Sequence, residues 1–246
     1  MGGKLSLSLE GGWVILRPFP PNVRFDGCSL ITGFHGIGAT GYWTVKYLIQ
    51  RLMPERVVVF DSDLIAPISS TFQGRLVTPY EVFRKGSLAI LKVEAPPYKD
   101  SDVEFFRAIG EWIIQSGFKE AALVGGLDSN LRYDDSTYRI AYTSSYKPIG
   151  ELAEAKVLED DHIIVGPVAI LLNYFEARGY PAFAILAYAS TERMDPRATA
   201  TAVSVLSRHY GFEVDVSTLL RGAEIIESEL QKAQAKASKA GESIYT

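Results

Sequence analysis

Three glycines within residues 33–41, GFHGIGATG, have the spacing of a dinucleotide-binding loop. Gly36, Gly38 and Gly41 spell G-x-G-x-x-G between a predicted strand and an apolar helix, and Asp61 follows Gly41 by twenty residues. In such a site the glycine N–H groups hold a pyrophosphate at the helix N-terminus, and the acid binds the ribose. The spacing therefore raises the hypothesis of a nucleotide- or nucleoside-dependent α/β enzyme that uses this loop and Asp61.

Two features of the same stretch oppose a nucleotide. The usual strand runs almost directly into the first glycine, whereas here Gly33, Phe34 and His35 follow the predicted strand. The chain also has no G-x-x-x-x-G-K-[ST] motif, so ATP hydrolysis is not indicated. Glycines also allow a strand to reverse into a closely packed helix, because they tolerate positive φ and close backbone contact. We favour this packing role and keep the enzyme as the alternative.

The other polar clusters give weaker indications of chemistry. His35 has no nucleophile or orienting partner in a recognisable motif. The run Glu159-Asp160-Asp161-His162 is more typical of a solvated turn before a strand than of a metal site. Asp61 and Asp63 are expected to cap or solvate a loop. We therefore predict no catalytic residue, no cofactor and no metal.

Short apolar runs alternate with helix-period segments along most of the chain. This alternation predicts an α/β fold in which a mostly parallel sheet is flanked by helices. Asp195-Pro196 marks the start of one helix, and Gly117, Gly179 and Gly211 mark helix ends. We assign residues 1–216 to this α/β domain. The predicted strands are residues 13–16, 28–32, 56–60, 88–93, 120–124, 162–165 and 182–188.

Residues 217–240 predict one long C-terminal helix. Its apolar residues recur at steps of four and three, which places them on one face. They are Leu219, Ala223, Ile226, Leu230, Ala233 and Ala237. Because only alanine continues this face after Leu230, the hydrophobic attachment weakens toward the end of the helix. We expect the last turns to project from the body and residues 241–246 to form a short flexible tail.

The composition excludes several classes of protein. A chain of 246 residues with 47% hydrophobic and 22% charged residues is typical of soluble globular proteins. A net charge of −4 provides no basic stripe for nucleic acid. No apolar run is long enough to span a membrane, the N-terminus does not resemble a signal peptide, and a single cysteine, Cys28, fits a reducing compartment. We expect a cytoplasmic protein that binds neither nucleic acid nor membrane.

Several motifs in a fixed order resemble the proteasome assembly chaperone family, particularly its archaeal members. They are SLITGFHGIGATG at 29–41, ILKVEAPP at 90–97, VGPVAILL at 165–172, ARGYPAFAILAY at 177–188 and MDPRAT at 194–199. The resemblance covers roughly residues 10 to 215. It implies an α/β fold similar to nucleoside phosphorylases, with the glycine run as a structural loop and no established catalytic residues.

The last three residues, Ile244, Tyr245 and Thr246, resemble the hydrophobic-Tyr-any docking motif of proteasome activators. With Thr246 as the end of the chain, the resemblance implies docking into pockets between α subunits of the core proteasome ring. The Thr246 carboxylate would meet a pocket lysine, and the gate would open without ATP, or ring assembly would be promoted. Because one tail is a weak ligand, we expect a homo-oligomer, with a tetramer as one candidate. Assembly and activation remain open alternatives.

Overall fold

The computed structural model of the protein describes residues 5–9, 12–72, 74–98 and 102–242, and a mixed β-sheet runs through them. Within these residues nine strands form the sheet in the order β1-β2-β4-β7-β8-β3-β9-β11-β10. The strands are β1 (Leu5–Leu9), β2 (Gly12–Phe19), β3 (Ser29–Gly33), β4 (Glu55–Ser62), β7 (Tyr80–Lys85), β8 (Leu88–Val93), β9 (Glu120–Asp128), β10 (Tyr138–Tyr142) and β11 (Ala182–Ala189). The short strands β5 (Ser70–Phe72) and β6 (Arg75–Val77) form a separate hairpin.

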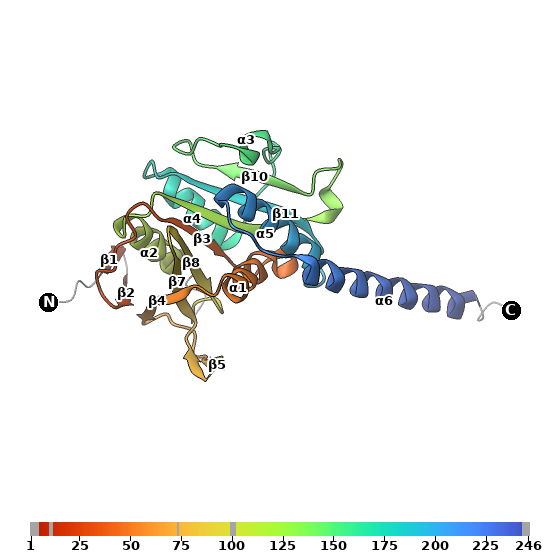
Figure 1. Ribbon diagram of the computed structural model, residues 1–246, viewed down its shortest axis with the longest axis horizontal. Helices are drawn as coiled ribbons and strands as arrows, with labels where there is room; N and C mark the ends of the chain where they lie inside the picture. The colour runs from red at the N-terminus through yellow and green to blue at the C-terminus, as the bar shows by residue number, and fades with distance from the viewer. Residues whose placement is uncertain (1–4, 10–11, 73, 99–101, 243–246) are drawn as a thin grey trace.

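Helices cover both faces of the sheet (Figure 1). One face packs against α2 (Asp102–Gln115) and α4 (Gly166–Glu176), and the other packs against α1 (Thr40–Leu52) and α5 (Pro196–Tyr210). The central strands are apolar on both sides; residues 121–124 of β9, for example, are fully buried. Such strands stay in the middle of a sheet because both of their faces remove apolar surface from water. The predicted α/β fold is therefore confirmed.

The sheet is less parallel than the sequence predicts. The four neighbouring strands β8, β3, β9 and β11 are parallel, but every other pair of neighbours is antiparallel. The reason lies in the connections: β7 and β8 are joined by the tight turn at Gly86, and such hairpins produce antiparallel neighbours. The prediction of a mostly parallel sheet thus holds only for the centre.

One predicted strand is wrong. Residues 162–165 belong to no strand, and Ile163 and Val165 are 82% and 73% exposed. A segment rich in β-branched residues forms a strand only where a neighbouring strand is available to pair with it. At the edge of the sheet, β10 instead pairs with a different segment: its Ile140 forms an isolated β-bridge with Val157. The short helix α3 (Glu151–Glu154) precedes this bridge.

The long C-terminal helix is confirmed as α6 (Ser217–Glu242), a helix of 26 residues. It extends away from the body along the longest axis of the molecule (Figure 1). The helix includes Gly241 and Glu242, which the sequence analysis assigned to the tail. None of the helices in the described ranges combines the length and apolar character needed to cross a membrane.

Candidate functional site

The base of α6 is fixed to the body by a small set of contacts. Asp215 begins the helix by accepting a hydrogen bond from the Ser217 backbone N–H at 2.8 Å. The Tyr47 hydroxyl donates to the Asp215 carbonyl oxygen at 2.6 Å, and Arg51 donates to the Thr218 hydroxyl at 3.0 Å. Ala223 is 2% exposed. The start of α6 is therefore held against α1.

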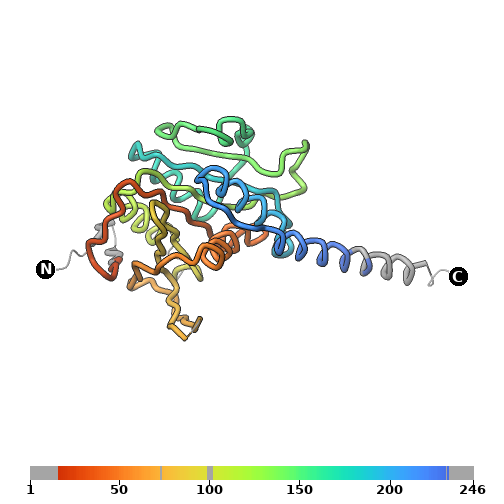
Figure 2. Tube along the Cα trace, in the orientation of Figure 1, coloured from red at the N-terminus to blue at the C-terminus, as the bar shows by residue number. Residues whose placement is uncertain are grey.

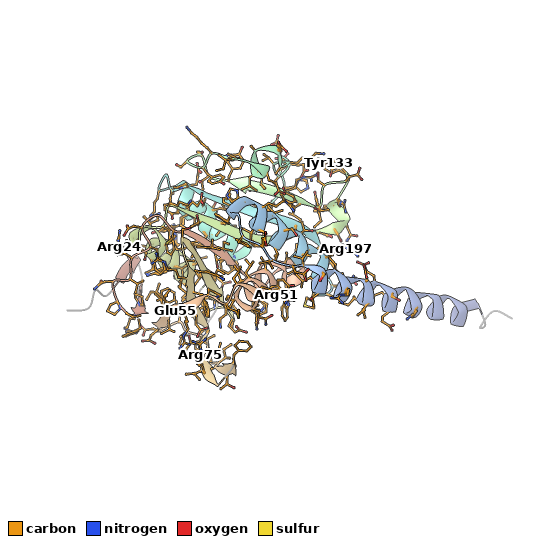
Figure 3. The ribbon with its side chains drawn as sticks, viewed as in Figure 1. Arg24, Arg51, Glu55, Arg75, Tyr133 and Arg197 are labelled. Atoms are coloured by element: carbon orange, nitrogen blue, oxygen red, sulfur yellow. The ribbon has the colours of Figure 1, made fainter. Side chains whose placement is uncertain are left out.

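Among the described side chains, a bidentate ion pair to α5 is the last contact of α6 with the body. Arg197 donates from Nε and Nη2 to the two carboxylate oxygens of Glu227, at 3.0 and 2.9 Å. Figure 3 shows Arg51 and Arg197 near the start of α6, on the body side. Beyond this point Leu230 is 41% exposed, and Lys232 pairs with Glu229 of the same helix. The predicted weakening of the attachment after Leu230 agrees with these contacts.

The predicted docking residues Ile244, Tyr245 and Thr246 lie outside the described residues. What the structure defines is the helix that carries them. From Glu227 to Glu242, α6 spans about 20 Å at 1.5 Å per residue. The tail therefore follows a helix whose last described turns lie well away from the body.

The glycines of the loop before α1 serve packing. A Cβ atom at Gly41 would lie 2.3 Å from the Val124 carbonyl oxygen, and one at Gly33 would lie 2.4 Å from the Gly41 oxygen. Gly38 has a φ of +62°, and its Cβ would lie 2.6 Å from the Cβ of Ala189. The loop and the start of α1 thus touch the backbone of β9 and the end of β11 directly. The packing role predicted for these glycines is confirmed at Gly38 and Gly41, whereas a Cβ at Gly36 would meet no atom within 4 Å.

Three backbone amide groups at the start of α1 are already used within the loop. The Ala39 N–H donates to the Gly36 oxygen at 2.8 Å, and the Tyr42 N–H donates to the Phe34 oxygen at 3.1 Å. The Thr40 N–H donates to the Ile37 oxygen, which closes the short 3-10 turn η1 (Ile37–Ala39). These three N–H groups at the helix N-terminus are therefore not free to bind a phosphate.

Asp61 does not complete a dinucleotide site. Strands β7 and β8 lie between β4, which carries Asp61, and β3, which precedes the glycine loop. Three strand spacings separate β3 from β4 by about 14 Å. The Asp61 carboxylate is 57% exposed and accepts from Arg17 at 3.0 Å. The interpretation of Asp61 as a ribose-binding acid is wrong, because the strand after α1 joins the sheet three places away from β3.

Two other polar residues from the sequence analysis have structural partners. His35 stacks on Tyr42 with ring centroids 3.9 Å apart, and burial lowers the pKa of its imidazole. Glu159 accepts from the buried Arg139 at 2.5 Å and from Tyr133 at 2.7 Å. Glu159 therefore neutralises a buried guanidinium and does not belong to a purely solvated turn. Within the described ranges, His, Cys, Asp and Glu form no cluster of three suited to a metal ion.

A cavity of about 460 Å³, which no sequence pattern indicated, lies beside α1. Its floor is formed by β4, β7 and β8, and the β5–β6 hairpin forms a wall that protrudes from the body (Figure 2). Side chains of alternating charge cross the floor. Lys92 Nζ lies 2.8 Å from Glu81 Oε2 and 3.3 Å from Glu94 Oε2, although Lys92 and Glu81 are only 5% and 1% exposed. Arg56 and Lys46 extend this row at its two ends, at 2.7 Å from Glu81 and 3.0 Å from Glu94.

The donors around Glu94 determine its ionisation. Burial by itself would raise the pKa of Glu94, but hydrogen bonds from Tyr42 and Lys46 and the charge of Lys92 outweigh burial. The pKa of Glu94 is thereby lowered to about 2. The cavity floor therefore keeps its carboxylates ionised and paired at neutral pH.

Comparison with known proteins identifies the family of this chain. Residues 30–234, from β3 into α6, match the sequence profile of the PAC2 family. The chain belongs to the PAC2 family. The family resemblance drawn from the sequence motifs is confirmed.

Solved structures agree with the PAC2 assignment. The fold is similar to that of Pyrococcus furiosus PbaA, described as an archaeal homolog of proteasome-assembly chaperone, with a TM-score of 0.70 and 22% identity over 92% of this chain and 99% of that one. It is also similar to Pyrococcus furiosus PbaB, described as an archaeal proteasome activator, with a TM-score of 0.69 and 18% identity over 90% and 98% of the two chains. Proteasome assembly chaperone 2 of Danio rerio is 26% identical over 146 residues, which are 55% of this chain and 56% of that protein.

A pH prediction follows from Glu94 in this PAC2 protein. Because the folded-state pKa of Glu94 lies below its usual value of 4.5, its stabilising contribution is complete above pH 4.5 and is lost as the pH falls toward 2. Urea unfolding of Glu94→Gln should show a loss of about 2 kcal/mol above pH 5, where the parent carboxylate is ionised in both the folded and the unfolded state. The difference from the parent should shrink below pH 4. A difference that stays constant between pH 6 and 3 would contradict the role of these donors.

Proposed function

We propose that this PAC2-family protein binds the core proteasome through Ile244, Tyr245 and Thr246. The observation that carries the proposal is the direction of α6, which leaves the body after Glu227 and extends beyond it (Figure 1). Family membership and the similarity in fold to PbaA and PbaB support a proteasome partner. The protein acts in the cytoplasm as a binding protein and not as an enzyme, and it needs no cofactor.

The proposed contact uses three different interactions in pockets between α subunits of the proteasome ring. Tyr245 provides an aromatic ring with a hydroxyl group, and Ile244 provides aliphatic surface to bury. The Thr246 carboxylate forms a charge-assisted contact with a pocket lysine. Because about 20 Å of helix separates Glu227 from Glu242, the tail can enter a pocket while the α/β body stays outside the ring.

Several tails in a homo-oligomer, with a tetramer as one candidate, make the binding tight. Linked sites gain on the order of 10² to 10⁴ over one site when their spacing allows simultaneous docking. Docking of several tails opens the gate of the proteasome without ATP, promotes ring assembly, or does both. The motif by itself does not distinguish these outcomes.

Removal of residues 244–246 tests the proposal directly. The truncated protein should no longer be retained by immobilised core proteasome, whereas the parent should be retained in the absence of ATP. Hydrolysis of a short fluorogenic peptide, measured in the same samples, separates gate opening from binding alone. Retention of the truncated protein at the parent level would overturn the proposal.

A further inference from the structure

The cavity beside α1 combines an excess of positive charge with an apolar wall. Four cations line it, Lys46, Arg56, Arg75 and Lys92, against the two carboxylates of Glu81 and Glu94. Its volume of about 460 Å³ lies within the range of small-molecule sites. Apolar side chains of α1 already pack in the core on this face of the sheet. Neither the excess positive charge nor the apolar wall of the cavity is therefore needed to hold α1 in place.

Both carboxylates in the cavity are already neutralised. Glu81 accepts from Arg56 and Lys92 and from the Thr78 backbone N–H, at 2.7, 2.8 and 3.1 Å. Glu94 accepts from the Tyr42 hydroxyl at 2.6 Å and from Lys46 at 3.0 Å, with Lys92 at 3.3 Å. Carboxylates that are surrounded by donors in this way are not positioned to attract a further cation.

The charge that remains without a counterion is positive. Arg75 lies on the β5–β6 hairpin, which Figure 3 shows projecting from the body, and the described residues provide its guanidinium with no hydrogen bond or ion pair. Arg56 donates to the Leu76 oxygen at 2.8 Å and to Glu81 through Nη1, which leaves its other guanidinium nitrogens without a partner among the described residues. Guanidinium groups bind planar oxyanions through paired N–H donors.

Apolar side chains surround these guanidinium groups. Ile49 of α1 and Met53, which follows α1, form one side of the cavity, Phe72 and Leu76 of the hairpin form the other, and Phe83 lies on the floor. Phe72 and Leu76 are 50% and 58% exposed, and Met53 is 82% exposed. A ligand with an apolar body would remove this surface from water.

We propose that this cavity binds a small organic anion, an oxyanion attached to an apolar body, between α1 and the β5–β6 hairpin. The oxyanion contacts Arg75 and the free nitrogens of Arg56, and the apolar body packs against Ile49, Phe72 and Leu76. An isolated two-stranded hairpin is only marginally stable, so a ligand that bridges it to α1 also orders the hairpin. This site is separate from the proposed docking tail and does not depend on it.

Nuclear magnetic resonance titration of the full-length, isotope-labelled protein tests the site with three probes. 4-Phenylbutyrate carries a carboxylate, phenyl phosphate carries a phosphate, and 4-phenyl-1-butanol has the same apolar body without charge. An anion of this size is expected to bind with a dissociation constant on the order of 1 mM. Amide shifts should centre on residues 70–77, and the alcohol should bind about tenfold more weakly than the carboxylate. The two anions distinguish a carboxylate site from a phosphate site.

Two variants with equal loss of charge provide the control. Arg75→Gln should weaken binding of the anion about fivefold, as expected for a partly exposed charge pair. Arg107→Gln removes an exposed arginine from α2, on the opposite face of the sheet, and should leave binding unchanged. Failure of both anions to bind at ten times the expected dissociation constant, equal binding of the alcohol, or equal effects of the two substitutions would each overturn the proposal.

Discussion

Replacing Tyr245 with alanine is expected to abolish detectable binding to the core proteasome. The substitution removes the aromatic ring and its hydroxyl hydrogen bond from what we propose to be the central contact of the tail. A loss of about 3 kcal/mol per tail, typical of an aromatic hot spot, weakens each contact roughly 150-fold. The loss is repeated in every tail of an oligomer, so the avidity of the assembly falls further. Surface plasmon resonance on immobilised core proteasome measures the change.

Two further variants show which part of the tail is responsible. Tyr245→Phe keeps the ring and removes only the hydroxyl, so it should bind at an intermediate level. One residue added after Thr246 displaces the carboxylate without changing any existing side chain, and it should reduce binding as strongly as Tyr245→Ala. Circular dichroism should be the same for all variants, because the contacts that fix α6 to the body end at Glu227. Parent-level binding by both Tyr245→Ala and the extended chain would make the tail irrelevant to function.

The strands that the sequence predicted best are those with a long run of consecutive apolar residues. Strands β8, β9 and β11 each contain at least four consecutive apolar residues, and their positions match the predicted runs closely. In β8 the buried Lys92 comes only after four apolar residues. Strands β7 and β10 were missed because a buried charged residue, Glu81 in β7 and Arg139 in β10, stands at the second position and leaves only a short apolar run. Ion pairs to Lys92 and Glu159 make that burial possible, and no local pattern reveals partners eleven and twenty residues away.

The order of the strands in the sheet could not be predicted from the sequence, for a related reason. Local spacing places a strand after α1 but does not say which neighbour it joins, and β4 pairs with β2 and β7 instead of β3. The cavity could not be predicted for the same reason, because its charged residues come from separate elements, among them α1, β4, β6, β7 and β8. Ile244, Tyr245 and Thr246, in contrast, could be proposed as docking residues from the sequence alone, because a contiguous motif needs no knowledge of the fold; their role in docking stays a prediction.

The glycine loop offers a second large effect, on stability. Gly41→Ala should destabilise the fold by about 3 kcal/mol or more, because the new Cβ would lie 2.3 Å from the Val124 oxygen and 2.6 Å from the Phe34 nitrogen. Both neighbours are backbone atoms within the packed centre of the sheet, so neither can move without shifting β9 or the end of β3. Urea unfolding at neutral pH measures the loss.

Gly36→Ala is the matched control within the same motif. Gly36 has a φ of 176°, which any residue adopts, and no heavy atom lies within 4 Å of a Cβ built there. This substitution should change the free energy of unfolding by less than about 0.5 kcal/mol. A dinucleotide loop would show a different pattern, since a side chain at its first glycine blocks the tight turn there. If Gly36→Ala abolished a nucleotide-induced rise in melting temperature, or if Gly41→Ala were as stable as the parent, the packing role of these glycines would have to be abandoned.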